Sequence, residues 1–127
     1  MLYVALVTLL LIIQYMVFMA LSGFARTKAN IEAPAMTGDE TYERASRVHV
    51  NTLEQLMITL PTMWVCAYFF RVDVAAALGL IFFVGRLIYS AAYRKNPPKR
   101  ATGMVIGFLA NVALVLSSFF GVITKLL

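Results

Sequence analysis

The chain has 127 residues, of which 61% are hydrophobic, and its formal net charge is +5. Soluble domains are about 45–50% apolar, so this composition predicts an integral membrane protein and excludes an ordinary soluble enzyme. A spanning helix needs about 20 mostly apolar residues, which leaves room for a single all-α domain of four helices, residues 1–127. The basic residues lie beside the apolar segments, which favours lipid headgroups and topology signals over nucleic acid as their partners.

The first helix is expected over residues 2–25, a segment without any charge. At 1.5 Å per residue it is about 36 Å long, enough to cross a bilayer. A signal peptide is the alternative, but the segment has no basic n-region and is longer than a typical signal-peptide core, so we expect it to be retained. Residues 26–41 are polar and contain Pro34 and Gly38, which predicts an extramembrane loop.

The second and third helices are expected over residues 42–70 and 72–93. The turn between them is so short that they must be antiparallel neighbours. Pro61 falls inside the second helix and is expected to kink it, because proline lacks a backbone donor and crowds the preceding turn. The fourth helix is expected over residues 99–125, where Gly103 and Gly107 form a GxxxG pair that permits close helix packing or oligomerisation.

Polar residues form one stripe on each of the two middle helices. Arg47, Asn51 and Glu54 stand at i, i+4 and i+7, and a second stripe has the same helical spacing: Arg86, Tyr89 and Tyr93. His49 lies about 200° from Arg47 around the helix, so it is expected to face a different neighbour, such as another subunit. Ionisable residues at bilayer depth are costly, which makes these stripes a candidate functional site.

Counting along the antiparallel helices places Glu54 and Arg86 about 10 Å from the same membrane surface. We therefore expect the two side chains to meet, directly or through a ligand, because either would otherwise be an uncompensated buried charge. A plain ion pair that fixes the register of the helices is the structural alternative. Arg100 sits where the fourth helix reaches the same surface, a position at which arginine often anchors lipid headgroups.

Lysine and arginine are distributed unequally between the two membrane surfaces. The first and third loops and the adjoining helix ends carry most of them: Arg26, Lys28, Arg44, Arg47, Arg94, Lys95, Lys99 and Arg100. Only Arg71 and Lys125 lie on the other side. The positive-inside rule therefore predicts that these loops and the polar stripes face the cytoplasm, with both termini across the membrane.

The candidate site residues are mostly cationic or hydrogen-bonding, with one carboxylate. Arginines that bind carboxylates and a glutamate that binds an ammonium group suit a small zwitterion of net negative charge. No phosphate loop, zinc-spaced His/Cys group, Ser/His/Asp order or nucleotide fingerprint is present. One cysteine, Cys66, excludes an internal disulfide and a cysteine-based metal cluster.

Two runs carry a resemblance to a known family. ERASRVHVNTLEQLMITLPTMW, followed by GRLIYSAAY and a basic loop ending in Arg100, resembles the membrane-associated proteins in eicosanoid and glutathione metabolism, the MAPEG family. The specific part is R-x-x-x-N-x-x-E on the second helix with R-x-x-Y-x-x-x-Y on the third. The short loops resemble those of a bacterial member of the microsomal glutathione transferase type, and an inner-membrane location is expected with them.

The resemblance implies a four-helix subunit assembled as a homotrimer, with glutathione as co-substrate at each subunit interface. It implies glutathione-binding roles for Arg26, Arg47, His49, Asn51, Glu54, Arg86, Tyr89 and Tyr93. Arg100 matches the arginine proposed to stabilise the glutathione thiolate. His49 stands where leukotriene C synthases have glutamine, and Gln55 where eicosanoid-synthesising members tend to have tyrosine.

The implied activity is a glutathione transferase that conjugates the thiolate to lipophilic electrophiles and also reduces hydroperoxides. Two alternatives from other classes remain. One is a non-catalytic lipid-binding or glutathione-binding scaffold of the same fold. The other is a small multidrug exporter of similar length. A chain that resembles such exporters is expected to have an essential glutamate in its first helix, and no acidic residue occurs in residues 2–25.

Overall fold

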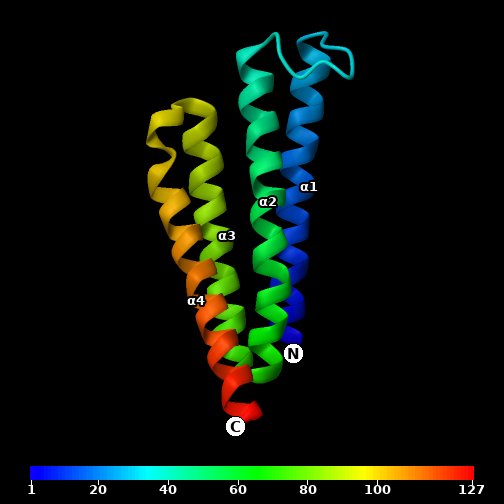
Figure 1. Cartoon of the computed structure of the whole chain (residues 1–127). Helices are drawn as coiled ribbons and strands as arrows, with labels where there is room; N and C mark the ends of the chain where they lie inside the picture. The colour runs from blue at the N-terminus through cyan, green and yellow to red at the C-terminus, as the bar shows by residue number, and fades with distance from the viewer.

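A computed structural model describes residues 1–127 as four long helices that run alternately up and down (Figure 1). The elements are α1 (Leu2–Lys28), α2 (Glu40–Phe69), α3 (Val72–Lys95), the short 3₁₀ helix η1 (Pro97–Arg100) and α4 (Ala101–Leu126). Their ends differ from the ranges expected from the sequence by three residues or fewer. Both termini and the α2–α3 turn lie at one end of the bundle, and the other two connections lie at the opposite end (Figure 1).

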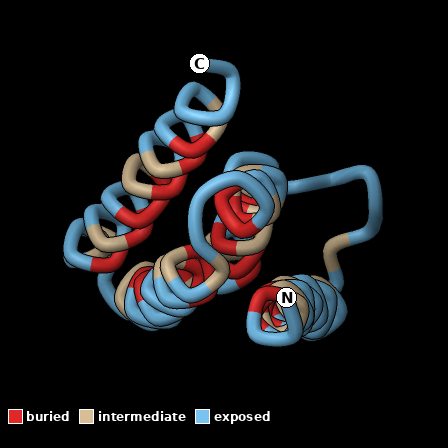
Figure 2. Tube along the Cα trace, turned by 90° about the horizontal axis from the view of Figure 1, so that it is seen from below, coloured by how far each residue is buried: buried red, intermediate tan, exposed pale blue.

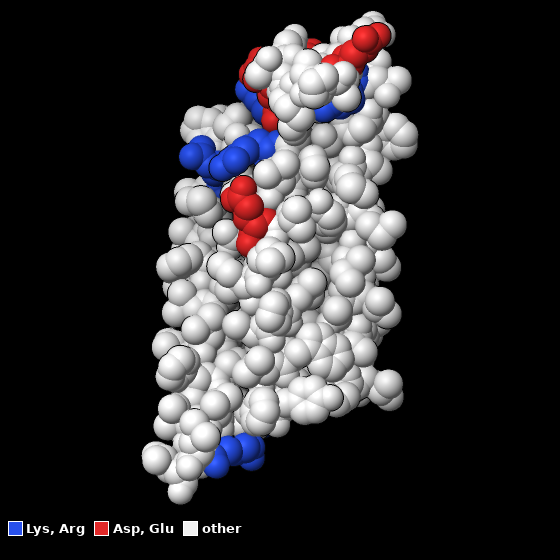
Figure 3. Space-filling view, turned by 45° about the vertical axis from the view of Figure 1, so that its right-hand side comes forward, with Lys and Arg blue, Asp and Glu red and all other residues white.

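Three segments are long and apolar enough to cross a membrane: α1, α3 and Pro97–Leu126. Helix α2 is more polar, because its first half carries the stripe of ionisable residues described above. Pro61 lies inside α2, and the helix continues on both sides of it. Charged side chains gather at the end of the bundle that holds the α1–α2 and α3–α4 connections, and most of the remaining visible surface is uncharged (Figure 3).

The core is a narrow seam between the helices rather than a broad interior. Each helix turns one stripe of buried residues toward its neighbours and leaves the rest of its surface exposed (Figure 2). On α1 the stripe includes Val4, Val7, Leu11 and Phe18, which follow the three-to-four-residue spacing of one helix face. The exposed side chains are largely apolar, as expected where lipid surrounds the bundle.

Helices α3 and α4 approach closely at Gly103. A Cβ atom on Gly103 would lie 2.3 Å from the backbone nitrogen of Tyr89 and 2.6 Å from the backbone oxygen of Gly85. The GxxxG pair predicted on the fourth helix is thus used within the chain, where it brings the first turns of α4 against α3. Gly103 therefore helps to fix the position of Tyr89, one of the candidate site residues.

Replacing Gly103 by alanine is expected to destabilise the protein by about 1–3 kcal/mol, because backbone atoms must move to make room for the methyl group. Thermal unfolding in detergent measures this loss. Gly23→Ala is the matched control, since a Cβ at Gly23 has nothing within 4 Å and alanine is the better helix former. Equal unfolding temperatures for the two variants would contradict the close approach at Gly103.

Candidate functional site

Arg86 of α3 is the most deeply buried charged residue, with 2% of its surface exposed. Its Nη2 donates hydrogen bonds to Thr52 Oγ1 at 2.8 Å and to Asn51 Oδ1 at 3.1 Å, and its guanidinium carbon lies 4.0 Å from the centre of the Tyr89 ring. Its Nε has no hydrogen-bond partner in the protein. All of its partners are neutral, so the positive charge of Arg86 has no carboxylate to balance it.

Glu54 does not pair with Arg86. Of the two contacts expected from the sequence, direct or through a ligand, the direct ion pair is therefore wrong. The structure contains two salt bridges, Arg44–Glu40 and Arg71–Asp73, and Glu54 is exposed. The predicted depth was nearly right, because Arg86 meets α2 only one turn from Glu54. The predicted orientation of Glu54 around the α2 axis was wrong, because the α2 residues that face Arg86 at that level are Asn51 and Thr52.

Aromatic and basic side chains continue from Arg86 toward the charged end of the bundle. The rings of Tyr89 and Tyr93 stack with centroids 5.5 Å apart and an interplanar angle of 25°. The guanidinium carbon of Arg100 lies 5.9 Å from the centre of the Tyr93 ring, and Arg100 Nη1 donates to the Pro97 carbonyl at 3.0 Å. The two arginines thus flank a pair of stacked tyrosines.

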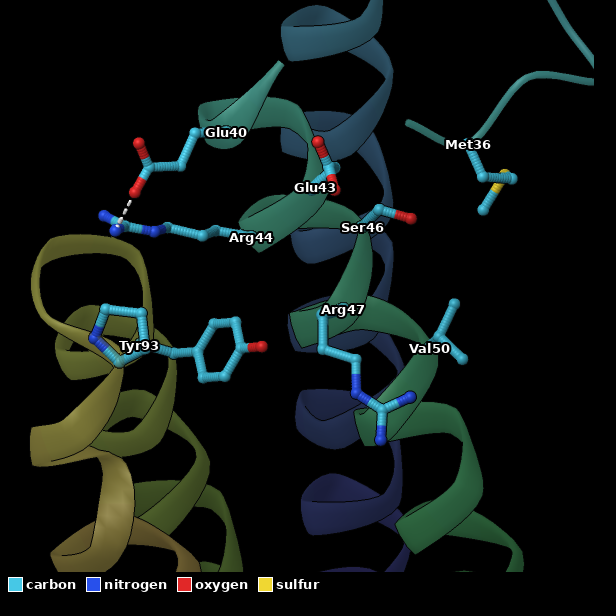
Figure 4. A pocket seen from close by; sticks show the side chains of 9 residues that line it. Met36, Glu40, Glu43, Arg44, Ser46, Arg47, Val50 and Tyr93 are labelled. Atoms are coloured by element: carbon cyan, nitrogen blue, oxygen red, sulfur yellow. Dashed lines mark hydrogen bonds and ion pairs between the residues drawn. The ribbon is translucent and has the colours of Figure 1, made fainter. Parts of the chain in front are cut away.

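Two hollows adjoin this column of side chains. The charged-end cavity, of about 640 Å³, lies between α2 and the connection from α3 to α4, with Arg47 on one side and Tyr93 on the other (Figure 4). The inner cavity, of about 320 Å³, is lined by Asn51, Gln55, Phe82, Arg86, Met104, Val105, Gly107 and Phe108. A polar ligand in the inner cavity would meet Arg86 and Asn51 beside an apolar wall from α4.

His49 and Arg26 line neither cavity. The His49 ring is half-buried with its centroid 6.1 Å from that of Tyr15 on α1, so its neighbour lies in the same chain. Arg26 holds the first loop: it donates to the Ala35 carbonyl at 2.8 Å and to the Tyr42 hydroxyl, and its guanidinium lies over the Tyr42 ring. Within one chain, both residues are thus separate from the group around Arg86.

Two further residues contribute to the site, and the sequence analysis did not single them out. Thr52 accepts the shorter of the two hydrogen bonds from Arg86. Arg44 lines the charged-end cavity, where it pairs with Glu40 and donates to the Arg94 carbonyl at 3.1 Å, so it joins α2 to the end of α3 (Figure 4). Arg44 lies one helical turn before Arg47, so an extension of the stripe on the second helix would include it. Nothing in the stripe pattern distinguishes Thr52 from its neighbours.

Comparison with known proteins identifies the family of this chain. The sequence model of the MAPEG family matches residues 4–120. The chain belongs to the MAPEG family. The resemblance drawn from the motifs on the second and third helices is therefore confirmed, and with it the assignment of the chain to a family of membrane proteins.

Relatives of this MAPEG protein occur in bacteria and in animals. An uncharacterized protein of the cyanobacterium Synechocystis is 37% identical over 98% of this chain and 91% of its own length. Human microsomal glutathione S-transferase 2 is 35% identical over 73% of this chain and 65% of its own length. The mouse protein of the same name is 32% identical over 83% of this chain and 71% of its own length.

Proposed function

We propose that this MAPEG protein is a membrane-bound glutathione transferase that conjugates glutathione to lipophilic electrophiles. The observation that carries the proposal is Arg86, a buried guanidinium whose protein partners are all neutral. A charge in that position is stabilised by an anionic ligand. Glutathione has two carboxylates and one ammonium group, and two animal relatives are named microsomal glutathione S-transferase 2.

The charged groups around the two cavities match the two ends of such a ligand. Arg86 and Arg47 bind its carboxylates, and Asn51, Tyr89 and Tyr93 supply further hydrogen bonds. Glu54, which is exposed and unpaired in one chain, binds the ammonium group. In this arrangement the ligand lies along the surface between α2 and α3, and it neutralises the charge of Arg86.

Arg100 activates the thiol. The thiol of glutathione has a pKa near ~8.5, like that of cysteine, so little thiolate exists at neutral pH. A guanidinium within hydrogen-bond reach of the sulfur favours the anion, and each unit by which the thiol pKa falls corresponds to about 1.4 kcal/mol. The thiolate then attacks an electrophile that arrives from the bilayer, or reduces a lipid hydroperoxide.

The working assembly in this proposal is a homotrimer with four membrane spans in each subunit. Helix α2 connects opposite ends of the bundle, so it crosses the membrane together with α1 and α3 (Figure 1). Arg26 and His49, which line neither the charged-end cavity nor the inner cavity, complete the glutathione site of a neighbouring subunit. The charged end faces the cytoplasm of a bacterial cell by the positive-inside rule (Figure 3).

The experiment is a conjugation assay on the purified protein in detergent, with glutathione and 1-chloro-2,4-dinitrobenzene. The expected result is enzyme-dependent formation of the thioether that saturates with glutathione. An equal preparation of an unrelated four-helix membrane protein is the control. Saturable glutathione binding without product from any electrophile tested would contradict the proposal and favour the non-catalytic scaffold.

A further inference from the structure

A chain of amide and hydroxyl groups, contributed by the half-buried Gln55 and the buried Thr59 and Asn111, joins α2 to α4 just beyond the site. The Thr59 hydroxyl donates to Asn111 Oδ1 at 2.6 Å, and Asn111 Nδ2 donates to Gln55 Oε1 at 3.2 Å. Thr59 is fully buried and Asn111 is 5% exposed. The Gln55 amide is thus held by its oxygen, and its Nε2 group donates to no protein atom. An amide donor beside apolar side chains is stabilised by an acceptor, which a ligand in an adjoining hollow can supply.

Gln55 stands at the junction of two hollows. It lines the inner cavity together with Asn51 and Arg86. It also lines a second hollow of about 340 Å³ between α2 and α4, here called the outer groove, whose other walls are mainly apolar residues such as Ile58, Phe108 and Val112. Phe108 belongs to both hollows and is 62% exposed, so the outer groove opens at the exposed apolar surface of the chain.

We propose that Gln55 is a specificity-determining residue, whose Nε2 donates a hydrogen bond to an oxygen on the electrophile held in the outer groove. The inference rests on the proposed transferase function. The preferred substrates are then long-chain α,β-unsaturated carbonyl compounds. Their apolar tail fits the groove, and their acceptor oxygen is conjugated with the reacting carbon. Alkyl and benzyl halides have the apolar part but no such oxygen.

The hydrogen bond from Gln55 is strongest in the transition state of the conjugation reaction. The glutathione thiolate forms a carbon–sulfur bond at the β-carbon, and the π electrons of the carbon–carbon double bond move toward the carbonyl oxygen, which becomes an enolate. A donor aimed at that oxygen stabilises the developing charge. Water then supplies a proton to the α-carbon, which replaces the thiol proton lost to solvent, and the product is a thioether.

The test compares two substrates in one enzyme preparation: trans-2-nonenal and benzyl chloride. The ratio of kcat/KM for the enal to kcat/KM for the halide is expected to fall at least about tenfold in Gln55→Met, since one hydrogen bond to a charged transition state is lost. Because the ratio is independent of the fraction of folded protein, partial unfolding of the variant does not affect it. Asn111→Leu, which frees the Gln55 amide to rotate, is expected to lower the ratio by less.

Gln14→Met is the matched control. Gln14 is the other glutamine of the chain. It is buried, and its amide donates to the Phe83 carbonyl at 3.0 Å, away from the outer groove. The ratio is expected to stay at the wild-type value in this variant. If Gln55→Met lowers the stability of the protein but leaves the ratio unchanged, the amide serves only to join α2 and α4, and the inference is wrong. A wild-type protein that conjugates 1-chloro-2,4-dinitrobenzene but not trans-2-nonenal would overturn this inference alone. A wild-type protein that conjugates none of the three electrophiles would overturn the transferase function itself.

Discussion

Replacing Arg86 by methionine is expected to weaken glutathione binding at least about 100-fold without lowering the stability of the protein. Charge-assisted hydrogen bonds in a buried site contribute on the order of 2–5 kcal/mol to binding, and 1.4 kcal/mol corresponds to a tenfold change in affinity. The free energy of unfolding is not expected to fall, because the protein alone provides no anion for Arg86. An apolar side chain of similar length removes the cost of burying that charge.

Two measurements on detergent-purified Arg86→Met check this expectation: equilibrium binding of glutathione, and thermal unfolding without glutathione. Arg94→Met is the control, since Arg94 lies on the same helix but is exposed. Normal binding together with a clearly lower unfolding temperature would show that Arg86 only holds the helices together. Loss of binding at an unchanged or higher unfolding temperature is the result that an anion site at Arg86 predicts.

Removing the guanidinium of Arg100 is expected to affect the chemical step rather than binding. Loss of one donor to a developing or preformed anion lowers kcat about 100-fold. In Arg100→Ala the thiol pKa of bound glutathione returns toward that of the free thiol, so less thiolate exists at neutral pH. The activity of the variant should therefore rise with pH toward and above ~8.5, where thiolate forms unaided, while the wild type already works at neutral pH.

The pH profile of kcat for the two proteins is the measurement for this prediction. Lys99→Ala is the matched control, because Lys99 is the preceding basic residue and its side chain is exposed. A profile of Arg100→Ala parallel to that of the wild type, with equal kcat, would remove Arg100 from the mechanism. The thiolate would then need another donor, and Arg47 at the charged-end cavity is the next residue to change.

The helices could be predicted closely from the sequence because hydropathy and chain length leave little choice. Twenty or more apolar residues bounded by charges at each end form a spanning helix, and the two-residue link at Phe70 and Arg71 forces α2 and α3 together. The same reasoning placed Arg86 within one turn of the residues that it contacts on α2. These features depend on distance along the chain, which the sequence records directly.

The partners of Arg86 could not be predicted because they depend on rotation of the helices about their axes. A stripe at i, i+4 and i+7 places Glu54 on the same broad face as Asn51, yet a small rotation of α2 decides which of them meets Arg86. His49 lies off the stripe, as expected, and the neighbour that the structure of one chain gives it is the ring of Tyr15 on α1.

The network of Gln55, Asn111 and Thr59 was also missed. Asn111 on α4 is 52 residues from Thr59 and 56 residues from Gln55 along the chain, and both of these lie on α2. None of the three is ionisable, so the hydropathy pattern gives no signal for the network. A network of this kind can be identified only from the structure, which shows that the three side chains are in contact and that Gln55 Nε2 has no acceptor in the protein. The sequence therefore gives a signal for the charged residues of the candidate site and none for this network.

The measurement that tests the central claim most directly is the far-ultraviolet thiolate absorbance of glutathione bound to the purified wild-type protein. Glutathione is added at neutral pH, the difference spectrum is recorded, and an aryl halide is then mixed in. A thiolate band that appears with the protein and disappears as the thioether forms is the predicted result. Bound glutathione that remains a thiol, with no change when the halide is added, would contradict a transferase that activates glutathione.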